Sequence, residues 1–414
     1  MGGRFWLLLA GFLASSMGTW IYRLALPLLV YDLTGSALGT GLVYVMEYVP
    51  YLLLGMVGGV LADRFPRRRV LVLGDLAAGL VTLVLAVTLM LQVRQLWVVY
   101  LLALVLASVD PLYQPAFRAI VPSLVPLDRL PQANARVHMG EHAVTMVGPV
   151  AGGALVVSFG YEVAIYTDAA TFLVSALLVA LIGRVPQAAP VRGASVVADI
   201  REGLRFLRVD KAVLTSGLIA LACNFGVWLL LANLVFYLSS YHRFTPGEIG
   251  VVYAFQGAGA VVGAILGGRL IRRHPPWRVI CWSITAAGLA MLLMIWARGP
   301  VLIGLAWMGQ FAGAAAMVVA IATVRQWLVP DRLLGRVLGT LRMIAFASIP
   351  LASLATGVFE TVVRDAYVLM AFAGVSWLVI AAGAALSPLR RVTPPAAVAG
   401  RSARPAACPP PDRD

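Results

Sequence analysis

The stretch GGVLADRFPRRRV, residues 58–70, places one Asp and four Arg between two apolar runs. VYVMEYVPYLLLGMV (43–57) precedes it and LVLGDLAAGLVTLVLAVTLML (71–91) follows it. Each run belongs to an apolar segment of about 20 residues, the length that a helix needs to cross a membrane. We therefore predict that residues 58–70 connect two membrane spans and that their charges have a specific role there.

The whole chain alternates in this way between apolar segments and short polar connectors. Its 414 residues are 61% hydrophobic, and the mean hydropathy is +0.90. A water-soluble protein of this composition would aggregate, so we predict an all-α membrane protein. About twelve segments are long enough to span the bilayer. The predicted spans are 5–30, 39–62, 69–92, 96–118, 132–157, 163–183, 212–239, 247–271, 278–297, 301–322, 337–362 and 366–387.

The net charge of +14 is distributed unevenly across the predicted membrane. With the N-terminus inside, roughly 27 Lys and Arg fall on the inner side and only about four on the outer side. The outer residues are Arg94, Arg243, Arg298 and Arg364. We therefore expect a multi-pass protein of a bacterial inner (plasma) membrane with both termini in the cytoplasm. Because this pattern explains the excess charge, we do not expect a nucleic acid partner.

Neither a cleaved leader nor a cysteine site is predicted. The first apolar run is too long for a signal peptide and contains Arg23. Cys223, Cys281 and Cys408 are far apart in the sequence, so we predict no disulfide framework, no cysteine metal site and no cofactor.

A polar segment, residues 184–211, divides the spans into two sets of six. Its apolar residues recur at helical spacing with Arg between them, which predicts an amphipathic helix on the inner leaflet. We expect an N-terminal bundle at 1–183, a C-terminal bundle at 212–387 and a disordered tail at 388–414.

The two sets of spans resemble each other in sequence. GGVLADRFPRRRV at 58–70 is similar to GGRLIRRHPPWRV at 267–279, and LVPLDRL at 124–130 is similar to LVPDRL at 328–333. Repeats at a nearly constant offset indicate an internal duplication. We therefore predict two pseudo-symmetric six-helix bundles, with a cavity between them that opens alternately to either side of the membrane.

These features resemble the major facilitator superfamily over essentially the whole chain. The connector at 58–70 is similar to the family signature G-x-x-x-D-R-x-x-R-R between spans two and three. The matching residues are Gly59, Asp63, Arg64, Arg67 and Arg68. In the family, the Asp and the following Arg form a cytoplasmic charge network that latches the two halves in the outward-open state. The resemblance implies the same role here, although Arg272 replaces the Asp in the second copy.

Asp110 lies toward the inner end of span four and is followed by Pro111. The resemblance implies that Asp110 joins the latch with Arg67 or Arg68. The alternative is that it is an internal partner for Arg118 or Arg136.

Other stretches resemble the efflux branch of the family, which includes macrolide exporters and the enterobactin exporter. They are ALPLLVYDLTGSALGTGLV (25–43), PAFRAIVPSLVPLDRLPQANA (115–135) and YTDAATFLVSALL (166–178). Span five also carries GPVAGG (148–153), similar to the antiporter motif G-x-x-x-G-P-x-x-G-G, with Val144 in place of the first Gly. The matching residues are Gly148, Pro149, Gly152 and Gly153. Ordinary packing of small residues is the alternative explanation of this motif.

Three charged residues inside the predicted spans are candidates for proton coupling: Arg23 and Asp168 in the outer half of the membrane, and Glu47 near its middle. An ionisable group in hydrocarbon is costly unless it pairs or faces water. Glu47 is predicted near the midplane, which makes it the leading proton carrier. Arg23 can pair with Glu47 or with Asp168, and a purely structural ion pair is the alternative for Arg23 with Asp168.

Span five contains a second polar cluster, RVHMGEH (136–142). His138 and Glu141 lie three residues apart on the helical face that also carries the antiporter motif, so they can pass protons at the interface between the halves. An inner-end polar face in contact with headgroups is the alternative. His138, Glu141 and His142 also fit H-x-x-E-H, a zinc-peptidase pattern, but no third ligand is in a suitable place. We therefore predict that the chain is not an enzyme.

Further polar and aromatic residues are candidates for the lining of a substrate cavity between spans 1, 2, 4, 5, 7, 8, 10 and 11. They are Trp20, Asn224, Trp228, Gln256, Gln310 and Arg342. Packing and interfacial belts are the alternative roles for the tryptophans.

Taken with the resemblance, these residues predict a proton-coupled antiporter that exports a bulky amphiphilic drug, macrolide or natural product as a monomer. Alternatives are a siderophore exporter, a lipid flippase, an uptake symporter, an intramembrane zinc peptidase and a non-transporting membrane sensor.

Overall fold

The computed structural model describes residues 2–93, 95–126, 129–183, 185, 196–363 and 365–392. Residues 393–414 of the predicted tail (388–414) lie outside the described residues. Residues 184 and 186–195 of the predicted linker (184–211) also lie outside them.

Every regular element that the described residues form is helical, as the sequence predicts. The N-terminal half contains α1 (Gly3–Thr34), α2 (Ala37–Arg64), α3 (Arg67–Met90), α4 (Leu96–Ala107), α5 (Asp110–Ile120) and α6 (Leu130–Leu181). A separate helix, α7 (Val196–Val209), follows. The C-terminal half contains α8 (Lys211–Ser240), α9 (Pro246–Leu270), α10 (Pro276–Leu293), α11 (Gly299–Leu328), α12 (Asp331–Val362) and α13 (Ala366–Ala385). Short 3₁₀ turns end α5 (Val121–Ser123) and follow α13 (Pro388–Arg391).

Eleven segments of the described residues are long and apolar enough to cross a membrane. One of them, Gln132–Leu181, is two crossings joined at Gly160, whose φ of 86° and ψ of 176° interrupt the helix. Glycine adopts a positive φ without the steric penalty of other residues, so the chain can reverse direction there. The eleven segments therefore supply twelve crossings, which confirms the predicted fold class.

The span at Leu96–Ser123 is broken in the middle, where α4 ends at Ala107 and α5 begins at Asp110. Pro111 occupies the first turn of α5, where a missing N–H group is tolerated. The break places Asp110 in the first turn of a helix inside the membrane, where the positive end of the helix dipole favours a carboxylate.

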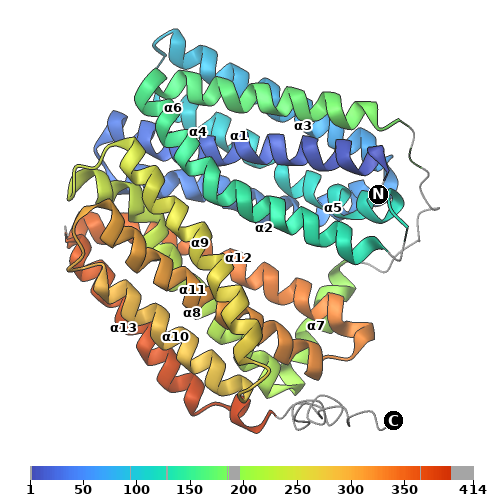
Figure 1. Cartoon of the computed structure of the whole chain (residues 1–414), viewed down its shortest axis with the longest axis vertical. Helices are drawn as coiled ribbons and strands as arrows, with labels where there is room; N and C mark the ends of the chain where they lie inside the picture. The colour runs from blue at the N-terminus through green and yellow to red at the C-terminus, as the bar shows by residue number, and fades with distance from the viewer. Residues whose placement is uncertain are drawn as a thin grey trace, which may run out of the picture.

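The two halves contact each other at one end of the molecule, opposite the end where the N-terminus lies. In Figure 1 the ribbons of the two halves separate toward the N-terminus and α7. At the joined end, the hydroxyl oxygens of Tyr44 (α2) and Tyr253 (α9) are 3.3 Å apart. Ser240 Oγ of α8 donates to Tyr31 Oη of α1 at 2.9 Å. These contacts close one side of the interface between the halves.

The helix α7 packs on the C-terminal half. Leu207 belongs to a buried cluster with Val213 of α8 and Val337 of α12. Glu202 forms an ion pair with Arg336 of α12. One face of the amphipathic helix in the linker is therefore covered by protein.

Candidate functional site

The central feature of the N-terminal half is an ion pair between α1 and α2. Arg23 Nε donates to Glu47 Oε1 at 2.6 Å, and the two side chains are 28% and 17% exposed. Glu47 lies about 15 Å from the start of α2, and Arg23 about 16 Å from the end of α1, at the helical rise per residue. Of the two acids predicted as partners for Arg23, the structure pairs it with Glu47.

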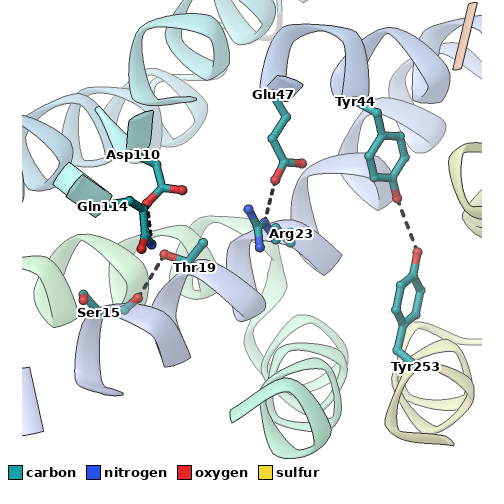
Figure 2. A network of polar contacts seen from close by, with 8 residues as sticks. All are labelled: Ser15, Thr19, Arg23, Tyr44, Glu47, Asp110, Gln114 and Tyr253. Carbon is teal, nitrogen blue, oxygen red and sulfur yellow. Dashed lines mark hydrogen bonds and ion pairs between the residues drawn. The ribbon is translucent and has the colours of Figure 1, made fainter. Parts of the chain in front are cut away.

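Polar groups extend from this pair along α1 and α5. Asp110 Oδ1 accepts a hydrogen bond from Gln114 Nε2 at 3.1 Å. Figure 2 shows Asp110 and Gln114 on one side of Thr19 and Arg23, with Glu47 and Tyr44 on the other. The Arg23 guanidinium also lies over the Trp20 ring, 5.5 Å from its centroid. Thr19, Arg23, Glu47, Asp110 and Gln114 line one space inside the half, whereas Tyr44 points to Tyr253 of the other half.

This space is a cavity of about 160 Å³ within the N-terminal half, which we name the N-half cavity. Its lining comes from helices α1–α6 and the short break between α4 and α5. Its polar members are Ser15, Ser16, Thr19, Tyr22, Arg23, Glu47, Tyr51, Asp75, Asp110, Tyr113, Gln114 and Asp168. A polar cavity of this size has room for about five water molecules at their volume in the liquid. Charged groups inside the bundle can therefore be hydrated.

Asp168 lines this cavity and is completely buried. Neither of its carboxylate oxygens has a hydrogen-bond partner in the described part of the chain. It faces α1 at Gly18, where an added Cβ would lie 2.5 Å from Asp168 Oδ1. The absence of a side chain at Gly18 leaves the space that the carboxylate occupies.

Asp75 of α3 is a further buried acid on the cavity wall, and it is not among the residues predicted above. Its Oδ2 accepts a hydrogen bond from Ser175 Oγ of α6 at 2.7 Å. A single acid inside the apolar run 70–90 is a sequence signal that could identify it.

The predicted latch lies at the end of the N-terminal half near the N-terminus. Arg67 Nη1 donates to Ala119 O at 2.7 Å and to Ser123 Oγ at 3.4 Å. Arg68 donates to the carbonyls of Val179 and Ala180. Both arginines therefore bind carbonyls at the C-terminal ends of helices in their own half, where a cation is favoured.

The remaining latch residues are Gly59, Asp63, Arg64 and Asp110. Arg64 is exposed at the end of α2. Gly59 and Asp63 lie in the last turns of α2, and the Asp63 side chain is outside the described part. Asp110, which the resemblance assigns to the latch, lies in the N-half cavity beside Gln114. Arg136, one of its alternative partners, stacks on Trp6 with its charge 4.9 Å from the ring centroid.

The antiporter motif joins α6 to helices of both halves. Gly148 packs against Trp20, and Gly152 against Ile21, both on α1. Gly153 packs against the backbone of α9, where its Cβ position would lie 2.5 Å from Pro246 O. In turn, the Cβ position of Gly250 would lie 2.6 Å from Pro149 O. Backbone contact this close between α6 and α9 requires glycine on both sides.

His138 and Glu141 form a second polar contact on α6, with His138 Nδ1 2.8 Å from Glu141 Oε2. The His138 side chain is 59% exposed, and His142 is also exposed. Within the described residues, no three His, Cys, Asp or Glu side chains are placed to hold a metal ion together.

The six predicted substrate-cavity residues lie in three different places. Trp20 lines the N-half cavity. Asn224 Nδ2 donates to Ala345 O and Ser348 Oγ, both at 2.9 Å, and so joins α8 to α12. Gln256 Oε1 accepts from Trp307 Nε1 at 3.2 Å, and Gln310 is completely buried. The last three belong to the packing of the C-terminal half.

Trp228 and Arg342 lie where the halves meet, within an aromatic cluster that sequence reasoning does not identify. Trp228 of α8 packs edge-on against Tyr48 of α2, with centroids 4.7 Å apart. Tyr51 packs against Phe346 of α12 at 5.7 Å, and the Arg342 guanidinium lies 5.1 Å from the Phe346 centroid. These rings are half-buried, which places aromatic surface between the halves beside an exposed arginine.

The sequence profile of the Major Facilitator Superfamily matches residues 8–245, more than half of the chain. The chain belongs to the Major Facilitator Superfamily. It is accordingly a multi-pass secondary transporter of a small molecule and not an enzyme.

Curated relatives of this transporter are distant. The uncharacterized MFS-type transporter YfiS of Bacillus subtilis is 29% identical over 63% of this chain and 63% of its own length, so the match spans less than two thirds of that relative. The multidrug efflux pump Tap of Mycolicibacterium fortuitum is 27% identical over 86% of this chain and 88% of its own length. The enterobactin exporter EntS of Salmonella typhi is 28% identical over 76% of this chain and 75% of its own length.

Solved structures share the fold. A bacterial homologue of the human lysosomal transporter Spinster, in an inward-facing and unoccupied conformation, superposes with a TM-score of 0.75 over 95% of this chain and 99% of that chain, at 17% identity. The nucleoside transporter NupG superposes with a TM-score of 0.72 over 93% of this chain and 98% of that chain, at 14% identity.

Proposed function

We propose that this transporter is a proton-coupled antiporter that exports a bulky amphiphilic compound, such as a drug, macrolide or other natural product. The observation that carries the proposal is the Arg23–Glu47 ion pair beside a polar cavity at mid-depth. A carboxylate that binds either an arginine or a proton can couple proton movement to a change of conformation. Ionisable residues inside a membrane typically have such a role. The names of two relatives, a multidrug efflux pump and an enterobactin exporter, support the outward direction.

In the proposed cycle, protonation of Glu47 breaks its ion pair with Arg23, and deprotonation restores it. Glu47 lies on α2, and α2 also packs against α12 of the other half. A change of charge on Glu47 therefore acts on a helix that joins the two bundles. We expect the bundles, residues 1–183 and 212–387, to rock about this interface, with the latch residues near Asp63 holding the outward-open state.

The proposed orientation has both termini in the cytoplasm of a bacterial plasma membrane, as the inner excess of Lys and Arg favours. The joined ends of the halves, where Tyr44 meets Tyr253, then lie outside, so the described arrangement corresponds to an inward-open state. His138 and Glu141 lie closer to the inner surface, where their contact can act as a second proton site.

The test is an accumulation assay in a bacterium that lacks its own efflux pumps. Cells with and without the protein receive ethidium, erythromycin and a fluorescent lipid in parallel. We expect lower accumulation of ethidium or erythromycin in expressing cells, and loss of this difference when an uncoupler collapses the proton gradient. Efflux that persists with the uncoupler contradicts proton coupling. Higher accumulation in expressing cells indicates an uptake symporter, and movement of the lipid alone indicates a flippase.

Siderophore export is the second candidate function, and the match to EntS, 28% identical over 76% of this chain, favours it. Expression in a strain that makes enterobactin but lacks its exporter tests this candidate. Restored enterobactin in the medium supports siderophore export, whereas an unchanged amount favours the drug-export reading.

A further inference from the structure

We propose that protons cross the N-terminal half through water in the N-half cavity, with Asp168 as the outer and Asp75 as the inner proton-carrying group. This inference rests on the proposed proton coupling and adds to it a route, a hydrated site and a residue, Asp75. The ligand of the site is a short chain of water molecules that passes an excess proton along its hydrogen bonds.

Unsatisfied polar atoms on the cavity wall indicate that the cavity is wet. The hydroxyls of Tyr22 and Tyr113 and both carboxylate oxygens of Asp168 are buried and have no hydrogen-bond partner of good geometry in the described part of the chain. All three residues line the same cavity. Buried polar groups are normally satisfied by protein or by ordered water. We therefore expect water to enter beside these groups, which the described arrangement encloses almost completely.

The geometry of α6 sets the length of the route. Asp168 and Ser175 are seven residues apart, so they lie on one face of the helix and about 10 Å apart along it. Ser175 Oγ holds Asp75 Oδ2 at 2.7 Å, which places Asp75 about the same distance from Asp168. Roughly three water molecules in hydrogen-bond contact bridge this distance.

The groups that face the two acids can exchange or stabilise a proton. Tyr22 and Arg23 of α1 lie close enough to Asp168 to interact with it electrostatically. Ser175 of α6 and Tyr113 of α5 face Asp75. Hydroxyl groups both donate and accept hydrogen bonds, so they can continue a water chain without binding the proton permanently.

The charges of the cavity also favour proton uptake. Its lining contains four carboxyl groups, on Glu47, Asp75, Asp110 and Asp168, and Arg23 is the guanidinium among them. Arg23 neutralises Glu47 through its ion pair. Asp75, Asp110 and Asp168 form no ion pair in the described part of the chain, and only Asp75 and Asp110 accept a side-chain hydrogen bond there. Carboxylates close together repel one another, so bound protons or water would stabilise these three acids.

The proposed transfer is balanced in atoms and charge. A proton from outside binds a carboxylate oxygen of Asp168, passes by exchange of O–H bonds through the cavity water, and binds a carboxylate oxygen of Asp75. Asp75 then releases one proton to water on the inner side. The lining of this route comes from α1–α6 and the connector at Val109, whereas the aromatic cluster of Trp228 and Phe346 lies between the halves. Tyr51 belongs to both, so the proton route adjoins the expected substrate route at this residue.

Infrared spectroscopy of the purified full-length protein in lipid tests the site without a substrate. Protonated carboxyl groups absorb in a separate band, which shifts when H₂O is replaced by D₂O. We expect the wild-type band to shift promptly, and parts of it to be absent in the Asp75→Asn and Asp168→Asn variants. The matched control is Glu360→Gln, which removes a buried carboxyl group bound to Asn233 in the other half. It should leave the Asp75 and Asp168 components unchanged.

A wild-type band that does not shift in D₂O overturns the proposal, because the carboxyl groups would then have no contact with water. This measurement needs no variant, so it stands even if a substitution prevents folding. A full band in both Asp variants overturns the assignment of these two residues.

Efflux from cells separates this inference from the proposed function. We expect uncoupler-sensitive efflux to fall about a hundredfold in the Asp75→Asn and Asp168→Asn variants, the lower end of what a positioned proton-transfer group contributes. Full uncoupler-sensitive efflux in both variants overturns the route while leaving proton coupling intact. Uncoupler-insensitive efflux by the wild-type protein refutes the coupling itself, and the route with it, whatever the infrared result.

Discussion

The two halves of this transporter differ in how they fill their interiors. In the C-terminal half, a large cluster of buried side chains runs through α8–α13, is joined by Leu24 and Leu28 of α1, and includes the nearly inaccessible Trp307 and Trp377. A second, smaller cluster around Val337 joins α7, α8 and α12. In the N-terminal half, the buried apolar side chains form separate clusters, one around Phe117 and another around Ile165. Members of both line the N-half cavity. We call the N-terminal half hollow because it contains the N-half cavity, and the C-terminal half packed because most of the largest buried cluster lies in it.

The difference suggests a division of roles between two related bundles. The hollow half holds Arg23, Glu47, Asp75, Asp110 and Asp168 around space that water can fill. Charges in hydrocarbon need hydration or partners, so a cavity is what makes this set of acids tolerable. The packed half can then serve as a rigid body against which the charged half moves, because densely packed interiors deform little.

The largest expected effect is a loss of stability on opening a hole in the packed half. Trp307→Ala removes a completely buried ring and should destabilise the folded protein by about 4 kcal/mol. Thermal unfolding of the purified protein in detergent measures this as a lower midpoint. The control is Trp97→Ala, because the Trp97 side chain is 64% exposed. If the two variants unfold at the same temperature, the C-terminal half is not packed as described.

The second prediction compares one acid from each half. Glu47→Gln should lower proton-dependent efflux about a hundredfold, because the side chain can no longer exchange a proton for Arg23. Glu360→Gln should leave efflux close to wild type, since Glu360 is bound to Asn233 and lies outside the N-half cavity. Uncoupler-sensitive efflux of ethidium or erythromycin measures both. Full activity of Glu47→Gln would remove this residue from the coupling mechanism.

The third prediction concerns the contact that joins the halves at α6 and α9. Gly250→Ala forces a methyl group toward Pro149 O and should disfavour the closed outer side by about 2 kcal/mol. Labelling of a cysteine at Ser353, in a background without native cysteines, should become roughly 30-fold faster, the equivalent of that energy. Ser353 is completely buried and faces Gly41 across the interface.

The matched control for Gly250→Ala is Gly268→Ala on the same helix. An added Cβ at Gly268 meets no atom within 4 Å, so this substitution should leave labelling unchanged. Equal labelling rates in the two variants would show that close backbone contact at Gly250 does not set the closure.

The fold could be predicted because length and hydropathy alone define membrane spans, and the twelve crossings agree with the predicted ones. The break between α4 and α5 could not, because it depends on how Ser108 to Pro111 pack against α2 and α3. That break matters for the site, since it places Asp110 at the start of a helix beside Gln114.

The site could be predicted only in part, because the spans are apolar on nearly every face. A helix that is hydrophobic all round gives no periodic signal for its rotation. The sequence therefore could not predict that Asn224 and Gln256 form hydrogen bonds with other helices of the C-terminal half. For the same reason, the sequence could not decide between Glu47 and Asp168 as the partner of Arg23. Only the placement of α2 beside α1 decides it.

The smallest expected effect tests the polar contact that holds the two unlike halves together. Tyr44→Phe removes one hydroxyl of the Tyr44–Tyr253 hydrogen bond, whose net contribution is about 1 kcal/mol. Labelling at Ser353 should therefore become about fivefold faster. Tyr253→Phe should have a similar effect, and the double variant should be little worse than either single one, because both remove the same interaction. Fully additive effects would mean that each ring supports the interface independently and that the hydroxyl bridge does not hold the outer side closed.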